Sequence, residues 1–296
     1  MFAVSGGSGF IGSHLCNALA AAKGEKPICI DVRAPASAQQ CIYKKADVRD
    51  LGALVGAIGG CETMFHLAAQ VSVQKSIEDP KEDFEINAKG TQNCLEACRK
   101  NSVKTFVYAS SAAIYGTPQY VPVDEKHPTL PLSPYGNSKL EGEKACEQYC
   151  RTYGMRTVCL RFFNVYGIGQ SPSSPYSGVI TKFSTRIKNN EPPVIFGSGS
   201  QTRDFVHVGD VVRACILASE SKNSAGKAYN IGTGKETSVL GLATTMIKLS
   251  GRKLQPQFRP ALEGEIEKSV AQIGLAKKDF GFSPKTSLED GLRELL

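Results

Sequence analysis

The stretch Phe2-Ala-Val-Ser-Gly-Gly-Ser-Gly-Phe-Ile-Gly12 decides which fold we expect for this chain. Its first residues, 2–5, are apolar or small and predict a short strand, and the glycines that follow open a helix expected over 9–22. Glycine allows the tight turn and the close approach of the backbone to a ligand that such a loop needs. A strand, a glycine loop and a helix in this order are typical of the first unit of a parallel α/β sheet.

An acidic residue at the end of the next expected strand is a second informative feature. That strand covers 27–31 and ends at Asp31, about 20 residues after the glycines. The N-terminus of a helix stabilises a pyrophosphate, and a carboxylate at this spacing binds the hydroxyls of an adenosine ribose. The pattern predicts a dinucleotide site. Asp31 repels a 2′-phosphate and favours NAD over NADP, whereas Arg33 is the one residue here that favours NADP.

Strands and helices alternate through the first half of the chain. This alternation predicts a parallel sheet with helices on both faces, and therefore the α/β class with a Rossmann-type, doubly wound sheet. The strand expected at 105–109 has no period-two alternation, as when both faces are buried. Strands are expected over 2–5, 27–31, 40–46, 63–67, 105–109 and 157–162, and helices over 9–22, 51–58, 80–101 and 135–153.

The composition changes after Asn164. Residues 167–178 are rich in Gly, Ser and Pro and predict a loop. Beyond it the expected strands are too few and too short for a separate large sheet. We therefore expect an NAD-binding domain over 1–165 and a smaller substrate-binding lobe over 166–296, interleaved with the first. The lobe is expected to have helices at 179–189, 208–218 and 239–250 and strands at 193–196, 228–231 and 254–258.

Composition and charge exclude several classes of function. The net charge of +7 is spread without a basic block, which argues against a nucleic-acid surface and fits an anionic small molecule. The sequence has neither an apolar run of transmembrane length nor a signal segment, so we expect a cytoplasmic protein with no membrane contact. Ten scattered cysteines then read as reduced thiols, and four widely spaced histidines predict no metal site.

Tyr135 and Lys139 carry the expected chemistry. They are four residues apart on a predicted helix, and therefore on one face of it. A phenolate can remove the proton of a secondary alcohol while a nicotinamide takes the hydride, and the Lys139 ammonium would lower the pKa of Tyr135. Ser111 would hold the same substrate oxygen. The alternative is that Tyr135 begins an ordinary amphipathic helix and Lys139 is a solvated surface charge.

Several motifs together resemble one family. The chain is similar to extended short-chain dehydrogenases/reductases, and within them to NAD-dependent nucleotide-sugar epimerases of the UDP-galactose 4-epimerase type. The motifs span nearly the whole chain: 6–12, Asp31, Asp47-Val48, His66-Leu67-Ala68-Ala69, Asn87, 110–116, 135–139, 161–167 and 203–210.

The resemblance implies roles for individual residues. Arg203 would clamp the diphosphate, because a guanidinium binds phosphate oxygens bidentately. Implied cofactor contacts are Gly6, Gly9, Phe10, Ile11 and Gly12 at the pyrophosphate, Asp31 at the adenosine ribose, Asp47 and Val48 at the adenine, Leu67, Ala68 and Ala69 at the nicotinamide ribose, and Asn87, Tyr135 and Lys139. Implied substrate contacts are Ser72, Ser111, Tyr135, Asn164, Arg203 and Ser269.

Purely structural roles stay open for some of these positions. Asn87 can bond a neighbouring loop from within its helix. Arg161 can be an ion-pair partner, and His207 reads as a packing or loop residue. Tyr115 and Tyr166 are expected in the wall of the site or in packing, and not as bases.

The segment 110–116 favours one reaction over others. Sugar 4,6-dehydratases of this type carry Asp-Glu where this chain has Ala112 and Ala113, and methyl groups cannot transfer protons. What remains is oxidation at C4 of a UDP-hexose to a ketone, followed by return of the hydride to the opposite face. The alternatives are a dehydratase or reductase of the same fold, and a non-catalytic NAD-sensing protein.

Substrate size and the diphosphate clamp depend on residues near the C-terminus. The resemblance places Ser269 where a Tyr closes the sugar pocket in enzymes restricted to UDP-glucose and UDP-galactose. A serine leaves room for an N-acetyl group, so UDP-GlcNAc and UDP-GalNAc are expected substrates. Leu262 stands where the family usually has a second arginine, Arg259 is the nearest replacement, and Gln272 replaces a common Asp.

By resemblance, the helices at 80–101 and 135–153 are expected to pair with their copies in a homodimer with a four-helix bundle. The sequence does not distinguish UDP from dTDP, and it does not identify the preferred sugar or the pathway.

Overall fold

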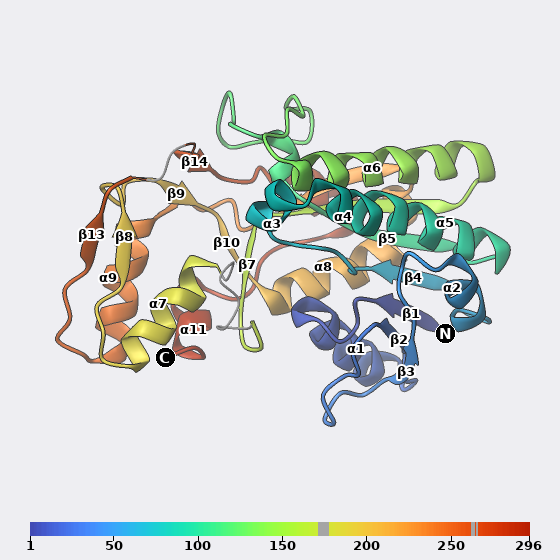
Figure 1. Cartoon of the computed structure of the whole chain (residues 1–296), viewed down its shortest axis with the longest axis horizontal. Coiled ribbons are helices and arrows are strands. Elements are labelled where there is room, and N and C mark those ends of the chain that lie inside the picture. Colours follow the sequence, from blue (N-terminus) through green and yellow to red (C-terminus); the bar gives the residue numbers. More distant parts are fainter. Residues whose placement is uncertain (171–177, 262–263, 265) are drawn as a thin grey trace.

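The computed structural model describes residues 1–170, 178–261, 264 and 266–296. A layered α/β body forms the right-hand part of the molecule in Figure 1, and a smaller lobe lies to its left. The chain begins in the body, beside β1, and ends in the lobe, beside α11. This arrangement confirms the expected Rossmann-type fold.

Seven strands form the parallel sheet of the body, in the order β11-β6-β5-β4-β1-β2-β3. The chain fills one side of β1 with β2 and β3 and then crosses to the other side, where β4, β5, β6 and β11 follow. Ligands of such sheets bind where the strand order reverses, outside the carboxyl ends of the strands. The strands are β1 (Phe2–Ser5), β2 (Ile28–Asp31), β3 (Ile42–Lys45), β4 (Thr63–His66), β5 (Thr105–Ser111), β6 (Arg156–Phe162) and β11 (Lys227–Ile231).

Helices cover both faces of the sheet, so its inner strands are buried on both sides. One apolar core contains Leu15 and Leu19 of the first helix and lies on the face of α1 and α8, and a second contains Leu95 and Cys98 and lies on the opposite face. The first face carries α1 (Phe10–Lys23) and α8 (Val208–Glu220), and the second α2 (Leu51–Ala57), α5 (Gly90–Lys100) and α6 (Pro134–Tyr153).

The helix expected over 80–101 is present but is not uniform. It consists of α4 (Pro80–Phe84), a π-helical turn (Glu85–Lys89) and α5. The sequence could not predict the π turn, because the residues in it are ordinary helix formers. Asn87 lies in this turn, and its side chain bonds the loop after β4. Such turns are frequent at functional sites.

The lobe has its own core, in which Phe183, Leu242 and Met246 are fully or almost fully buried. Its sheets are short, as expected. The lobe contains α7 (Val179–Lys188), α9 (Val239–Ser250), α11 (Leu288–Arg293), β7 (Asn164–Tyr166), β8 (Val194–Phe196), β9 (Thr202–Arg203), β10 (Phe205–His207), β12 (Thr237–Ser238), β13 (Gln257–Arg259) and β14 (Lys268–Ser269).

The second half of the chain also returns to the body. β11 pairs with β6 at the edge of the main sheet, and α8 packs against α1. The remaining elements are α3 (Val73–Glu78), α10 (Gly274–Phe280) and two 3₁₀ turns, Ala112–Tyr115 and Lys222–Ser224. None of the helices in the described ranges is long and apolar enough to cross a bilayer.

Candidate active site

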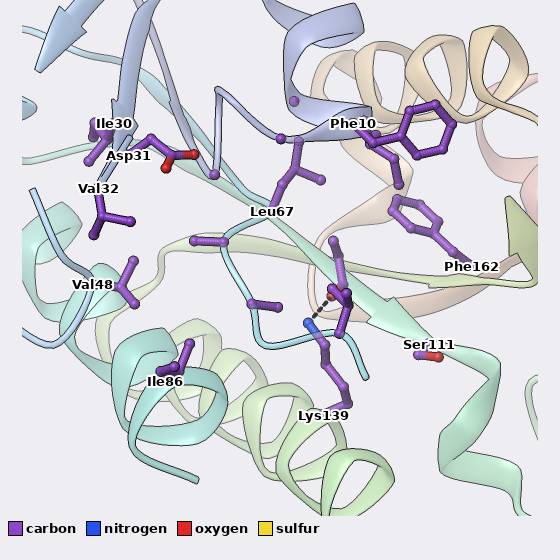
Figure 2. A pocket seen from close by; sticks show the side chains of 18 of the residues that line it. Phe10, Ile30, Asp31, Val32, Val48, Leu67, Ile86, Ser111, Lys139 and Phe162 are labelled. Atoms are coloured by element: carbon purple, nitrogen blue, oxygen red, sulfur yellow. Dashed lines mark hydrogen bonds between the residues drawn. The ribbon is translucent and has the colours of Figure 1, made fainter. Parts of the chain in front are cut away.

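A cavity of about 770 Å³ lies at the carboxyl ends of the sheet strands, where the strand order reverses. Figure 2 shows Asp31 at one end of it, next to Val32 and opposite Val48, and Ser111 and Lys139 at the other end. A pocket of this size is typical of cofactor sites. The two ends hold different chemistry and are built from different elements.

The glycine loop lets the backbone form one wall of the cavity. Gly6 has a positive φ of 68°, and a Cβ placed on it would lie 2.5 Å from the backbone nitrogen of Ala68. A Cβ on Gly12 would collide with the carbonyl oxygen of Gly6. Gly9 caps α1 without a side chain, so the first turn of the helix presents its amides and its positive dipole end to the cavity. This is a site for a phosphate group.

Asp31 is held in place at the far end of the cavity. Its two carboxylate oxygens accept hydrogen bonds from the backbone amides of Ser8, at 3.1 Å, and Arg33, at 3.0 Å. Asp31 is almost buried and still lines the cavity, so its remaining lone pairs can accept ribose hydroxyls. Nearby, the Arg49 guanidinium lowers the pKa of Asp47 through hydrogen bonds.

Local structure explains the position of each group at the catalytic end. Ser111 is the last residue of β5, and its hydroxyl accepts the amide of Ala113 at 3.1 Å. Ser133 caps α6, whose first turn carries Tyr135 after a proline at the favoured first position. Lys139 follows one turn later. Its Nζ donates to the carbonyl oxygen of Ala109 at 2.9 Å and lies 5.9 Å from the centroid of the Tyr135 ring.

Electrostatics at this end differ from the expectation. Burial lowers the pKa of Lys139 to about 8, and the negative charge of Asp83 opposes this change. Burial also raises the pKa of Tyr135, the hydroxyl of Ser111 lowers it, and Asp83 raises it further. The pKa of Tyr135 is therefore raised, and not lowered as was expected from the spacing to Lys139. The lysine ammonium is directed to a backbone carbonyl, and desolvation is the largest effect on the phenol.

A buried ion pair lies behind Ser111. The guanidinium of Arg161 contacts the carboxylate of Glu143 at 2.7 Å, and both side chains are almost inaccessible. Ser110 donates to Glu143 at 2.5 Å, and Arg161 also donates to the hydroxyl of Tyr115 at 2.8 Å. These contacts join β5, β6 and α6. The alternative reading of Arg161 as an ion-pair partner is confirmed, and Tyr115 belongs to the same network.

Asn87 and Ser72 lie beside the cavity and are not among the residues that line it. The side chain of Asn87 accepts the amide of Gln70 at 2.9 Å and donates to Asp83 and to the Gln70 carbonyl. The hydroxyl of Ser72 caps α3 by accepting the amide of Lys75. Asn87 therefore bonds a neighbouring loop, as its alternative reading stated, and both side chains are engaged in supporting the wall of the cavity.

The predicted substrate contacts Asn164, Arg203 and Ser269 come together around Asp204, also outside the cavity lining. Asn164 bonds the carbonyl oxygen of Asp204 through its amide at 3.0 Å and its side chain at 3.2 Å. Ser269 lies opposite Arg203 in the β14–β9 pairing. The Asp204 carboxylate accepts the hydroxyl and amide of Thr233 and the amides of Gly234 and Ala271. We call Asn164, Arg203, Asp204, Thr233, Gly234, Ser269 and Ala271 the Asp204 cluster.

Arg259 and Gln272 are not part of the Asp204 cluster. Arg259 is exposed and lies on β13, at the outer edge of the lobe in Figure 1. Gln272 accepts the amide of Gly274. Leu262 lies outside the described residues.

Aromatic side chains in the cavity wall were not assigned from the sequence. Phe162, the last residue of β6, and Phe163, which follows it, line the cavity, as do Ile86 and Gln170. The signal was present, because an aromatic pair at the carboxyl end of a buried parallel strand points to a ligand crevice. Of the predicted site residues, the cavity lining contains Gly6, Gly9, Phe10, Ile11, Gly12, Asp31, Asp47, Val48, Leu67, Ala68, Ala69, Ser111, Tyr135 and Lys139.

Each histidine has a local structural partner. His66 is buried between the hydroxyls of Ser5, at 2.6 Å, and Thr91, at 3.0 Å. His207 caps α8 and lies 3.2 Å from Glu294, which agrees with its reading as a packing or loop residue. All ten cysteines fall within the described ranges and are free thiols.

A family model matches most of the chain. Residues 2–232 match the model described as the NAD dependent epimerase/dehydratase family.

Individual proteins are similar over their whole length. A relative from Methanocaldococcus jannaschii, named a putative UDP-glucose 4-epimerase, is 39% identical over 100% of this chain and 97% of its own. The solved structure of UDP-glucose 4-epimerase from Thermotoga maritima with UDP-glucose has a TM-score of 0.93 and 35% identity, covering 99% of this chain and 96% of its own. UDP-N-acetylglucosamine 4-epimerase from Methanobrevibacter ruminantium, solved with UDP-N-acetylmuramic acid, has a TM-score of 0.91 and 31% identity, covering 99% and 96%.

Proposed function

This chain belongs to the NAD-dependent epimerase/dehydratase family, and on that premise we propose that it inverts the configuration at C4 of a UDP-hexose. One observation carries the proposal. Ser111, Tyr135 and Lys139 line one end of a cavity whose other end is the glycine loop and Asp31. A proton acceptor therefore faces the same space as a dinucleotide cradle, and relatives with epimerase names cover the whole chain.

The residues present fit NAD. The amides at the start of α1 face the pyrophosphate position, where a side chain at Gly6 or Gly12 would not fit. Asp31 would hold the adenosine ribose and exclude a 2′-phosphate by its charge, and Val48 would contact the adenine. Leu67 and Ala68 would line the nicotinamide ribose.

The catalytic step depends on three side chains. Tyr135 removes the proton of the C4 hydroxyl and later returns one, and Ser111 holds the same oxygen. Lys139, as an ammonium, stabilises negative charge on the phenolic oxygen. NAD⁺ supplies the acceptor of the C4 hydride and its positive charge favours the phenolate. A hydride given back to the same carbon would leave no net oxidation or reduction, so turnover would not require the cofactor to be exchanged.

The hexose must turn over between the two half-reactions, so the nucleotide diphosphate has to be held firmly and the sugar loosely. Arg203 and Asn164 would hold the diphosphate; the Arg203 guanidinium donates to the carbonyl oxygens of Thr202 and Ile266, and the Asn164 side chain donates to that of Asp204. Ala112 and Ala113 form a 3₁₀ turn directly after Ser111 and offer no acid or base for elimination of water. This composition favours epimerisation over dehydration.

We also propose that N-acetylated sugars are substrates. Ser269 lies opposite Arg203, so it is close to the predicted diphosphate clamp, and a serine there leaves room for an N-acetyl group. One similar solved structure is a UDP-N-acetylglucosamine 4-epimerase.

A homodimer through the helical stretch 80–101 (α4, the π turn and α5) and α6 is a further part of the proposal. These helices lie side by side on one face of the sheet (Figure 1). Their outer face is open to solvent, and Phe84 and Tyr153 at its ends are about half exposed. Free thiols at all ten cysteines agree with a cytoplasmic location.

The test is an assay of UDP-glucose, UDP-galactose, UDP-GlcNAc and UDP-GalNAc with the purified protein and no added cofactor. We expect interconversion within each pair, co-purified NAD, and no net NADH. A reductase would require added cofactor and accumulate oxidised or reduced product. A dehydratase would release a 4-keto-6-deoxy sugar. Either result, or loss of all NAD without any turnover of the four sugars, would refute the proposal.

A further inference from the structure

Asp83 is a carboxylate in the interior of the protein. It lies on α4 and has no solvent-exposed surface. Its Oδ1 accepts Gln70 Nε2 at 2.9 Å and Asn87 Nδ2 at 3.0 Å, and its Oδ2 accepts the Ser138 hydroxyl at 2.6 Å. All three groups donate, which is the pattern that an ionised carboxylate requires. None of them carries a charge, so these contacts do not neutralise Asp83.

Lys139 is a buried residue of the opposite charge. Its side chain is almost fully buried, and its Nζ donates to a backbone carbonyl, that of Ala109. Ser138 precedes Lys139 on α6, and the hydroxyl of Ser138 bonds both Asp83 and the carbonyl oxygen of Tyr135. The hydroxyl that bonds the buried Asp83 carboxylate therefore belongs to the residue directly before the buried Lys139.

Burial of a lone charge is expensive, and a nearby opposite charge reduces that cost. We propose that Asp83 is a positioning residue for Lys139: its buried charge keeps Lys139 in the ammonium form next to Tyr135. The role of Lys139 in turnover rests on the proposed function, whereas the charge coupling itself does not. The Gln70, Asn87 and Ser138 side chains hold the carboxylate in place, and the π turn brings Asn87 to it.

The other titratable groups around Lys139 do not supply this charge. On α6, Tyr135 is a neutral phenol whose pKa burial raises, and Glu143 is paired with Arg161. On β5, the Tyr108 ring lies 5.1 Å from Nζ, and burial raises the pKa of its hydroxyl. On β4, burial lowers the pKa of His66 to about 3, so this residue is neutral. On α3, Lys75 pairs with Glu82.

Removal of the Asp83 charge should shift the pKa values of Lys139 and Tyr135 in a known direction. The Asp83 carboxylate favours the protonated form of both Lys139 and Tyr135. In Asp83→Asn, both groups should therefore lose their protons at lower pH than in the wild type. A role limited to packing would leave both titrations where they are.

The experiment uses the NAD-loaded protein labelled with ε-¹³C-lysine. The Lys139 signal is identified by its absence in Lys139→Arg. We expect a wild-type midpoint near pH 8 and a midpoint lower by about one pH unit in Asp83→Asn. Glu85→Gln is the matched control, because it removes a carboxylate two residues away at a half-exposed position. Its midpoint should equal that of the wild type.

Unchanged midpoints in Asp83→Asn would overturn the inference. If that variant does not fold, the double variant Asp83→Asn/Lys139→Met is measured, because removal of both charges should restore folding. A double variant that is no more stable than the single one would also overturn the inference. Enzyme assays separate the two proposals. Shifted midpoints in a protein without epimerase activity would refute the function alone, and an active enzyme with unshifted midpoints would refute only the charge coupling.

Discussion

The cofactor cavity and the Asp204 cluster hold the two groups of predicted site residues, and they are built by different means. The cavity is formed by strand ends, a glycine loop and one helix turn, and most of its predicted residues face an open space. The Asp204 cluster is organised around one buried residue: the carboxylate of Asp204 bonds the loop after β11 and Ala271 after β14, and its backbone carbonyl bonds Asn164 of β7.

This difference shows what each half has to do. In the proposed function the dinucleotide would be held largely through backbone groups, which tolerate little change in shape, and small side chains and glycines dominate that part of the cavity. The substrate half has to present long side chains in a fixed arrangement, and a shared acceptor such as Asp204 provides it. Substitutions in the cofactor cavity and in the Asp204 cluster should therefore have different effects on activity and binding.

The largest effect is expected at the catalytic end of the cavity. Tyr135→Phe removes the group that exchanges the substrate proton and should lower kcat by about 10²–10⁴-fold. Bound NAD should remain, since the glycine loop and Asp31 are unchanged. The epimerase rate and the NAD released from denatured protein measure both quantities. Tyr115→Phe, which removes a buried hydroxyl of the Arg161 network, is the control and should keep most of the activity.

The next largest effect is expected in the Asp204 cluster, and it should change substrate binding without changing NAD binding. Asp204→Ala leaves the donors of Thr233, Gly234 and Ala271 without their acceptor, and the buried amide of Ala271 alone should cost about 1–3 kcal/mol. Arg203 should then be misplaced, and KM for the UDP-sugar should rise at least about tenfold.

Asp210→Ala is the matched control for Asp204→Ala. Asp210 is also buried and accepts the backbone amides of Lys285 and Thr286, but it lies at the start of α8 and not in the cluster. It should lower the melting temperature without raising KM, and NAD content should be normal in both variants. An equal rise of KM in both variants would show that the Asp204 cluster has no special role.

A smaller effect is expected at Ser269. Ser269→Tyr should lower kcat/KM for UDP-GlcNAc relative to UDP-glucose by about tenfold, because the ring would take the space of the N-acetyl group. Ser269→Ala should leave the ratio nearly unchanged. The assignment of Ser269 to the sugar pocket is wrong if the ratio is the same in all three proteins.

The smallest effect concerns stability in acid. Burial lowers the pKa of His66 to about 3, so between about 6.5 and 3 the unfolded chain binds a proton that the folded protein does not. Stability should therefore fall as the pH falls through this window. Between pH 7 and 5.5 the contribution of His66 is about 1 kcal/mol. Urea unfolding at both values measures it, and His66→Gln should show a loss smaller by that amount.

Much of the fold and one half of the site could be predicted from the sequence. The glycine loop, Asp31 and the Tyr135–Lys139 spacing are local patterns that act through adjacent backbone, and the structure brings them to one cavity. Most strands of the body are hydrophobic runs of clear length, so their positions were also predictable, whereas β3 is short and largely exposed.

The remainder depends on contacts between distant segments. The π turn at Glu85–Lys89 is stabilised by bonds from Asn87 to the loop at Gln70, which no local pattern reveals. The pKa of Tyr135 was predicted with the wrong sign, because spacing gives the distance to Lys139 but not the degree of burial. Asp204 was missed as an organising residue, since the four donors to its carboxylate come from two segments distant in the sequence, residues 233–234 and Ala271.

The edge strand β11 has a consequence for how the chain is made. On the ribosome, residues 1–165 emerge first, but the sheet that they form exposes the seven-residue edge of β6 until Lys227–Ile231 have been synthesised. An unpaired edge of that length invites pairing with another nascent chain. Fragments that stop at residue 165 should therefore aggregate during expression, while the full-length polypeptide protects its own edge soon after the later segment leaves the exit tunnel.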